Sequence, residues 1–169
     1  MEAFMLRTAV CSGSFDPVTN GHIDIFERAS RIFDELVVCV FFNPNKPVGM
    51  FSVEERVEML REATKHIPNV RVTSYAGLLN KFCEQENIGF VARGLRAFSD
   101  FEYELQRALL LKSINKNLET VFIMTNPNYS YVSSSGVREL AVFGGKVEDM
   151  VPPCVAVRVK AKFEEKKAK

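Results

Sequence analysis

Short runs of apolar residues alternate with longer segments of helical periodicity along the whole chain. The apolar runs, expected to be strands, cover residues 8–11, 35–42, 70–75, 90–92 and 119–124. The helical segments cover residues 21–33, 52–66, 78–86, 99–112 and 133–143, and a last helix begins at residue 152. Strands that alternate with helices are joined by right-handed crossovers. The order therefore predicts an α/β protein with a five-stranded, parallel, doubly wound sheet.

Start and stop signals for helices agree with this order. Ser52 and Glu55 form a capping box, and a second box is expected over Ser99–Glu102. Gly144 follows the helix expected over 133–143 and marks its end. The sequence has no internal repeat and no linker, so residues 1–169 are expected to form a single domain, with 162–169 as a frayed tail.

Composition and charge exclude several classes of protein. Apolar residues make up 47% of the chain and charged residues 25%, which is typical of soluble globular proteins. The net charge is +1, so a protein that coats duplex nucleic acid is not expected, and any anion site must be a local cluster. No apolar run approaches the ~20 residues of a membrane span, and the first residues do not resemble a signal peptide. We expect a cytoplasmic protein.

Cysteine and histidine are too few and too widely spaced for several familiar sites. The four cysteines, at positions 11, 39, 83 and 154, fit neither a zinc site nor a disulfide framework. Cys11 and Cys39 lie inside apolar runs and are expected to be small core side chains. His22 and His66 are accompanied by no Ser-His-Asp set, Cys-His pair or carboxylate cluster. No metal ligand from the protein is expected.

Loops at the carboxyl ends of the strands are where a doubly wound sheet binds its ligands. The sequence places these loops at 12–22, 43–51, 76–79, 93–100 and 125–135. The first loop ends in Thr19–His22, where a helix begins and its free N–H groups favour an anion. The position of His22 also suits a surface histidine that caps its own helix. Neither GxxxxGK[ST] nor GxGxxG is present, so the loop must hold phosphate in another way.

Basic side chains follow two more of the expected strands. Lys46 lies in the second loop, where it could also be an ordinary solvated lysine. Arg93 and Arg96 follow a buried strand directly, and each guanidinium could bind phosphate through two hydrogen bonds. Asp100 and Glu104 could orient these arginines or could simply form a solvated helix face.

Three serines, at 133–135, open a helix where one would suffice as a cap. The additional hydroxyls and the N–H groups of the helix make a plausible cradle for a polyphosphate, although a flexible loop is an alternative. Taken together, the loops bring a histidine, a lysine, two or three arginines and several hydroxyls to one edge of the sheet. This set indicates an α/β enzyme that binds phosphates. Its substrate would carry its own nucleophile, and the protein would align the groups and stabilise charge.

Residues Gly13–His22 read GSFDPVTNGH and resemble nucleotidyltransferases that carry the [HT]xGH signature. More narrowly, the chain resembles the bacterial phosphopantetheine adenylyltransferases. The resemblance continues, in order and over nearly the entire chain, through Lys46, Phe51–Arg56, Arg93–Ala97, Asp100–Glu104, Ser133–Ser135 and Val137-Arg138. It implies a Rossmann-like nucleotidyltransferase fold with a C-terminal helix.

The resemblance also implies an activity. AMP would pass from ATP to 4′-phosphopantetheine, giving dephospho-coenzyme A and pyrophosphate in coenzyme A biosynthesis. The acceptor phosphate would attack the α-phosphorus of ATP in line with the leaving pyrophosphate, and His22 would stabilise the transition state. Mg²⁺ would be held by the phosphates of ATP and not by the protein. Coenzyme A is implied as a candidate feedback inhibitor, and a homohexamer as the assembly.

Two sets of binding residues are implied in the same way. For the acceptor they are Ser14, Lys46, Leu79 and Arg93. For ATP they are Ser14, Phe15, His22, Gly94, Leu95, Arg96, Glu104, Tyr129, Ser130, Tyr131, Val132, Ser133, Ser134 and Ser135.

The sequence departs from the family pattern at a few positions. The loop at 47–50 is one residue longer than is usual, which leaves the reach of Lys46 open. Relatives often carry threonine in place of Ser14 and asparagine in place of Leu111. Gly136 lies in the first turn after the serines and weakens that helix by ~1 kcal/mol.

Three alternative functions stay open at this point. A related transferase that acts on nicotinamide mononucleotide or glycerol 3-phosphate would share the TxGH loop, but would not be expected to carry the string Arg93–Glu104. A nucleotide sensor without catalytic activity would not need to keep His22 and the basic residues. An RNA-binding fragment related to synthetases is disfavoured by the net charge of +1.

Overall fold

A single parallel sheet carries the fold. The computed structural model describes residues 6–45, 49–96 and 98–167. The strands are β1 (Thr8–Gly13), β2 (Glu35–Phe42), β3 (Val70–Ala76), β4 (Phe90–Leu95) and β5 (Glu119–Met124). They lie in the order β3-β2-β1-β4-β5, and every neighbouring pair is parallel. The prediction of a five-stranded, doubly wound sheet is confirmed.

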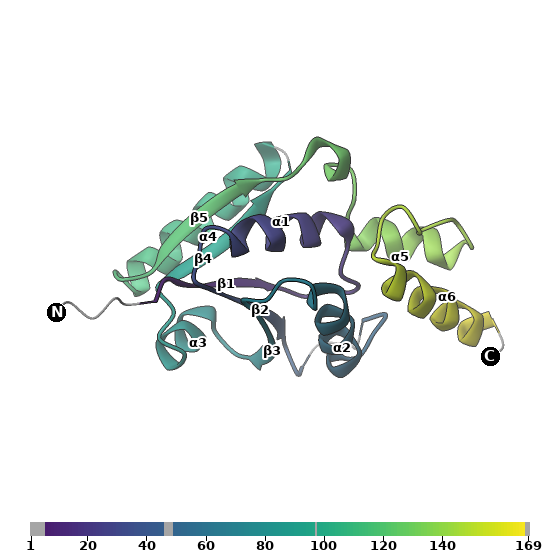
Figure 1. Ribbon diagram of the computed structural model, residues 1–169, viewed down its shortest axis with the longest axis horizontal. Coiled ribbons are helices and arrows are strands. Elements are labelled where there is room, and N and C mark those ends of the chain that lie inside the picture. Colours follow the sequence, from purple (N-terminus) through teal and green to yellow (C-terminus); the bar gives the residue numbers. More distant parts are fainter. Residues whose placement is uncertain (1–5, 46–48, 97, 168–169) are drawn as a thin grey trace.

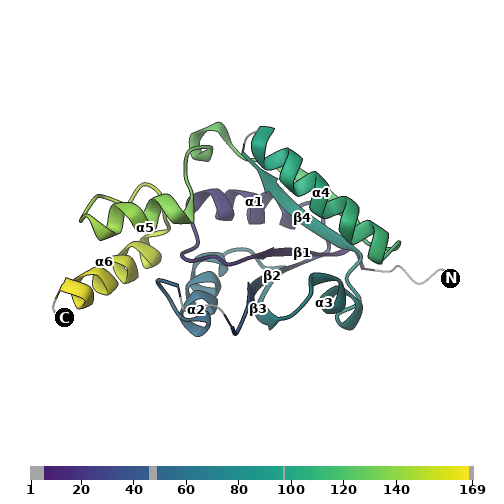
Figure 2. The same ribbon diagram turned by 180° about the vertical axis from the view of Figure 1, so that it is seen from behind.

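Helices cover both faces of this sheet, as Figures 1 and 2 show. The helices of the described residues are α1 (Asn20–Ser30), α2 (Val53–Thr64), α3 (Leu79–Gln85), α4 (Phe98–Ile114), α5 (Ser134–Val142) and α6 (Pro153–Lys167), with a 3-10 turn η1 (Pro127–Tyr129) after β5. Along β2, alternate residues enter opposite core groups: Val38 faces the group with α1 and α2, and Val37 faces the group with α3. Burial on both faces explains why β2 reads as one continuous apolar run.

The direction of winding reverses between β1 and β4, which are neighbours in the sheet although two other strands separate them in the chain. The loops that follow these two strands leave the sheet toward opposite faces. A crevice opens between them at the carboxyl ends of the strands, which is where ligands bind in folds of this kind.

α5 and α6 lie beyond the carboxyl ends of the strands (Figure 1). α6 is joined to α2 by an ion pair between Lys162 and Glu55, with 2.6 Å between Nζ and Oε1. Val155 and Val159 of α6 are buried in the larger core group. α6 is helical to Lys167 and so includes most of the stretch 162–169 where the sequence predicts fraying.

Of the two helix starts predicted from capping boxes, one is confirmed and the other is wrong. The capping box at Ser52 and Glu55 is confirmed. The box predicted over Ser99–Glu102 is not the start of a helix: α4 begins at Phe98, which places Ser99 inside the first turn. Within the described ranges, no helix has both the length and the apolar character needed to span a membrane.

Candidate active site

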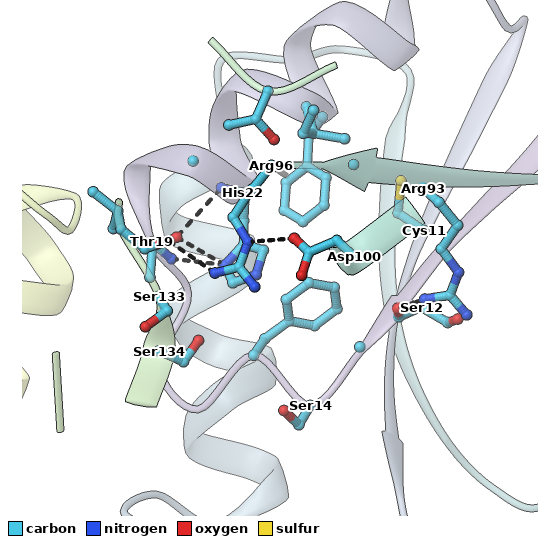
Figure 3. A pocket seen from close by; sticks show the side chains of 18 of the residues that line it. Cys11, Ser12, Ser14, Thr19, His22, Arg93, Arg96, Asp100, Ser133 and Ser134 are labelled. Carbon is cyan, nitrogen blue, oxygen red and sulfur yellow. Dashed lines mark hydrogen bonds and ion pairs between the residues drawn. The ribbon is translucent and has the colours of Figure 1, made fainter. Parts of the chain in front are cut away.

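A cavity of about 550 Å³ opens at the carboxyl ends of β1 and β4 (Figure 3). Its walls come from β1 and the loop after it, α1, the end of β4, the first half of α4, Thr125 and the start of α5. The size is within the range typical of sites for small molecules. The reversal of the sheet therefore forms a site where the sequence places one.

Most of the residues implied for ligand binding line this cavity. They are Ser14, Phe15, His22, Arg93, Gly94, Arg96, Glu104, Val132, Ser133, Ser134 and Ser135. Segments that lie far apart in the chain thus meet at one place.

Other implied residues lie elsewhere. Leu79 packs against the core group that contains α3. It follows β3, which lies at the edge of the sheet and is separated from β1 by β2. Leu95 is buried. In the loop after β5, Tyr131 is 68% exposed, while the Ser130 hydroxyl donates to the carbonyl of Pro127. Tyr129 ends the turn η1 and does not line the cavity. Lys46 lies outside the described residues.

His22 has two roles at once. The backbone N–H of Thr19 donates to His22 Nδ1 at 3.0 Å, and the Thr19 hydroxyl accepts from the backbone N–H of His22. This is a capping box in which histidine takes the place of the usual glutamate. The ring also lines the cavity. The structure confirms that His22 caps its own helix and places its ring at the cavity wall, while its role in a reaction stays a prediction.

The cap determines which nitrogen of His22 carries the proton. Because Nδ1 accepts a backbone hydrogen bond, the neutral ring must hold its proton on Nε2. Burial, together with the positive charge of Arg96, lowers the pKa of His22 from 6.5 to about 4. At neutral pH the ring is therefore uncharged, and Nε2 is a hydrogen-bond donor and cannot act as a base.

Protein stability should report this shift in the pKa of His22. Between about pH 6.5 and pH 4 the unfolded chain binds a proton on His22 that the folded protein does not bind. The free energy of unfolding should therefore fall as the pH falls through this window, by at most about 3 kcal/mol for a shift of this size. Denaturant titrations at pH 7 and pH 4.5 should show that the free energy of unfolding falls less in His22→Gln than in the wild type. An equal fall in both proteins would contradict the lowered pKa of His22.

Arg93 is held by the protein and is still incomplete in its hydrogen bonding. Its Nη1 donates to the carbonyl of Ser12 at 2.6 Å, and its Nε lies 3.4 Å from a carboxylate oxygen of Glu104. Among the described side chains, Arg93 Nη2 is the buried polar atom with no hydrogen-bond partner. Burial lowers the pKa of Arg93, and the negative charge of Glu104 opposes this effect. The guanidinium nevertheless stays charged at neutral pH. A buried, charged and unsatisfied donor at the wall of a cavity is suited to an anion.

Arg96 lies on the His22 side of the cavity. Its Nε pairs with Asp100 at 3.0 Å, one helical turn further on, and its Nη1 donates to the carbonyl of Val132. Asp100 thus orients an arginine, which is one of the two interpretations that the sequence leaves open. Figure 3 shows Arg96 and Arg93 well apart, with Ser14 near the floor of the view.

The three serines at the start of α5 differ in their contacts. Ser133 caps the helix by accepting from the N–H of Gly136 at 3.0 Å. Ser134 donates to the carbonyl of Pro17 and so joins α5 to the loop after β1. Ser135 is exposed and contacts the Ser133 hydroxyl at 3.2 Å. The N-terminus of α5 and Ser135 are the part of this segment available to a phosphate.

Some residues of the wall are not among the individual site residues that the sequence predicts. Cys11 is a core residue as expected, but it also lines the cavity, and burial raises the pKa of its thiol to about 12, so it is no nucleophile. Tyr103 and Thr125 also line the wall. Thr125 directly follows β5, and this position at the carboxyl end of a strand is the signal that could have indicated its place in the wall. Nothing in the sequence indicated which way Tyr103 faces.

Comparison with known proteins agrees with this site. Residues 10–140 match the model of the cytidylyltransferase-like family, and the chain belongs to that family of nucleotidyltransferases. The match contains the loop after β1, the strand that carries Arg93 and the serines of α5.

Two solved structures show the same fold. A Vibrio parahaemolyticus protein assigned as a nicotinate-nucleotide adenylyltransferase superposes with a TM-score of 0.67, at 17% identity, over 92% of this chain and 91% of its own. A lipopolysaccharide core biosynthesis protein from Thermoplasma volcanium GSS1 superposes with a TM-score of 0.55, at 19% identity, over 72% of this chain and 99% of its own. At these identities the likeness concerns the fold.

Proposed function

We propose that the protein transfers AMP from ATP to 4′-phosphopantetheine. The class of reaction is supported by the family and by a cavity with phosphate-binding groups at the switch point of the sheet. The choice of acceptor is supported by the ordered resemblance to phosphopantetheine adenylyltransferases, above all the string Arg93–Glu104. The observation that carries the proposal is the buried, unpartnered Nη2 of Arg93, which a phosphate would satisfy.

In the proposed reaction an oxygen of the acceptor phosphate attacks the α-phosphorus of ATP. The bond from that phosphorus to the bridging oxygen breaks, and pyrophosphate leaves with the electron pair. His22 donates from Nε2 to an α-phosphate oxygen as charge builds there, which is the action of a fixed donor in a partly dry site. Arg93 holds the acceptor phosphate, while Arg96 and the start of α5 bind the nucleotide.

Mg²⁺ belongs to the proposal as a ligand of the ATP phosphates, where it neutralises charge. The carboxylates of the cavity wall are those of Asp100 and Glu104, and each is paired with an arginine. Within the described part of the chain, no group of three or more histidine, cysteine or acidic residues could hold a metal ion. This donor set fits a metal that arrives with the nucleotide.

Arg93→Ala tests the assignment of the acceptor end. We expect the dissociation constant of phosphopantetheine to rise by about tenfold or more, because a charged hydrogen bond to phosphate is lost. That of ATP should change much less. Calorimetric titration of each ligand measures both values, and the reverse order would show that the two ends of the cavity are exchanged.

Pyrophosphate release tests the choice of acceptor. The protein, ATP and Mg²⁺ are incubated with 4′-phosphopantetheine or with nicotinate or nicotinamide mononucleotide. We expect release with phosphopantetheine. Release with a mononucleotide alone would replace the acceptor and keep the class of reaction. ATP binding without release would support the nucleotide sensor.

Three further parts of the account also stay proposals. Coenzyme A, which shares the pantetheine arm, is proposed as a feedback inhibitor, and the cytoplasm as the location. Self-association to a homohexamer is proposed from the resemblance. It is supported by apolar side chains that α4 leaves exposed, among them Leu109 at 62%, Leu110 at 62% and Ile114 at 56%.

A further inference from the structure

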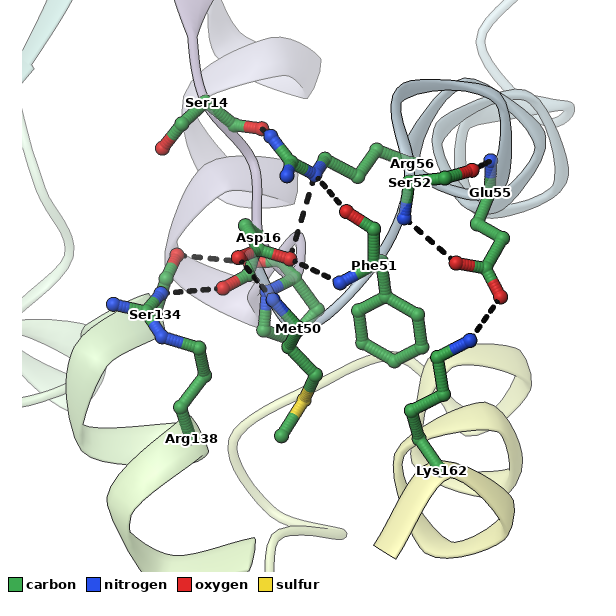
Figure 4. A network of polar contacts seen from close by, with 11 residues as sticks. Ser14, Asp16, Met50, Phe51, Ser52, Glu55, Arg56, Ser134, Arg138 and Lys162 are labelled. Atoms are coloured by element: carbon green, nitrogen blue, oxygen red, sulfur yellow. Dashed lines mark hydrogen bonds and ion pairs between the residues drawn. The ribbon is translucent and has the colours of Figure 1, made fainter. Parts of the chain in front are cut away.

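The loop between β1 and α1 is held by side chains of two helices (Figure 4). Three of its carbonyl oxygens, those of residues 14, 16 and 17, accept hydrogen bonds from Arg56 Nη1, Arg138 Nη1 and Ser134 Oγ respectively. Arg56 comes from α2 and the other two from α5. These contacts fix the path of the loop at three of its peptide groups.

Asp16 is the centre of this network. Its carboxylate accepts from the backbone N–H groups of Met50 and Phe51, each at 2.9 Å, and lies 3.4 Å from Arg56 Nε. The Asp16 and Arg56 side chains are only 8% and 9% exposed. The packing is so close that a Cβ on Gly49 would lie 2.0 Å from Asp16 Oδ2. The carboxylate therefore has one position available to it.

Phe15, between Ser14 and Asp16, has a backbone conformation that a side chain rarely adopts, with φ at +46°. Such a conformation persists only where the surroundings enforce it. Here it turns the buried Phe15 ring against His22, with 5.1 Å between ring centroids and an edge-on geometry. The loop thus also fixes one side of the His22 ring, and Thr19 fixes its Nδ1.

We propose that Asp16 and Arg56 are positioning residues that set the loop at 13–19, and through Phe15 the His22 ring, for the transfer reaction. The inference rests on the proposed function. It predicts that disturbing the pair slows the reaction beyond what the loss of stability explains.

Two variants disturb the pair differently. Arg56→Lys keeps the charge but loses the planar fork that reaches Phe51, Ser14 and Asp16 together. Gly49→Ala removes no polar group but displaces the Asp16 carboxylate. In both, we expect kcat to fall by about tenfold or more, because small misplacements of reacting groups are costly. The KM for ATP should change by less than about threefold, because Arg96 and α5 are intact.

Leu60→Ala is the matched control. Leu60 is fully buried on the same helix as Arg56 and its side chain has no polar atom, so its truncation lowers the melting temperature without removing a hydrogen bond or ion pair of the network. All variants are assayed well below their melting temperatures. A kcat that falls equally in Leu60→Ala and Arg56→Lys would show a structural role only and would overturn the inference.

Hydrogen exchange separates this inference from the proposed function. Amides of residues 13–19 should exchange faster in Arg56→Lys than in Leu60→Ala, without any ligand present. If the wild type releases no pyrophosphate with any acceptor, the proposed function fails. The exchange rates of residues 13–19 in Arg56→Lys and Leu60→Ala then still decide the positioning role, and equal rates in these two variants would overturn it.

Discussion

His22→Ala should lower kcat by about 10²-fold or more, because it removes a donor placed where charge develops in the transition state. The dissociation constant of ATP should change little, since the neutral ring contributes mainly when the α-phosphate oxygens gain charge. Steady-state rates and calorimetry measure the two quantities. An equal loss in ATP binding and in rate would contradict a role in the transition state.

His22→Gln is the control that separates catalysis from helix capping. Glutamine is an ordinary third residue of a capping box and can accept from the N–H of Thr19, as His22 does. We expect His22→Gln to keep the stability of the wild type, whereas His22→Ala also loses about 1 kcal/mol of capping. The glutamine variant should still be slow. Wild-type rates in His22→Gln would show that the cap alone matters.

Asp16→Ala should have the largest effect on stability. It leaves the buried charge of Arg56 and the N–H groups of Met50 and Phe51 without their partner. Removing one member of a buried ion pair costs about 3–5 kcal/mol. Denaturant unfolding at neutral pH measures this loss as a lower midpoint at an unchanged slope.

Glu84→Ala gives the comparison for Asp16→Ala. Glu84 pairs with Lys81 at 2.9 Å, but the two side chains are 44% and 60% exposed. An exposed pair of this kind contributes little to stability, because water and salt screen it. A loss in Asp16→Ala no greater than that in Glu84→Ala would contradict the assignment of Asp16 as the buried centre of the network.

Much of the fold follows from local patterns that act independently of the rest of the chain. The continuous apolar run at 35–42 predicts a strand covered on both faces, and β2 is such a strand. The capping box at Ser52 needs only its own neighbours. The reversal between β1 and β4 then places the loop at Gly13–His22 beside Arg93, which is why these residues could be expected at one site.

What escaped prediction depends on contacts between distant segments. Asp16 next to proline is typical of a turn, and only the folded chain places Arg56 against its carboxylate. Leu79 packs beside α3, away from β1 and β4 in the sheet, which periodicity does not reveal, and its contact with the acceptor stays a prediction. Sequence offers Asp100 as either an arginine partner or a solvated acid, and the choice depends on how α4 is rotated.

Transfer of a labelled α-phosphate tests the central claim most directly. ATP made chiral at its α-phosphorus with oxygen isotopes is incubated with the protein, Mg²⁺ and 4′-phosphopantetheine, and the product is analysed for its configuration. Cys11 is protonated and His22 Nδ1 is occupied, so we expect no enzyme-bound intermediate. The account predicts AMP joined to phosphopantetheine with inverted configuration. Retention of configuration, or no transfer to this acceptor, would contradict it.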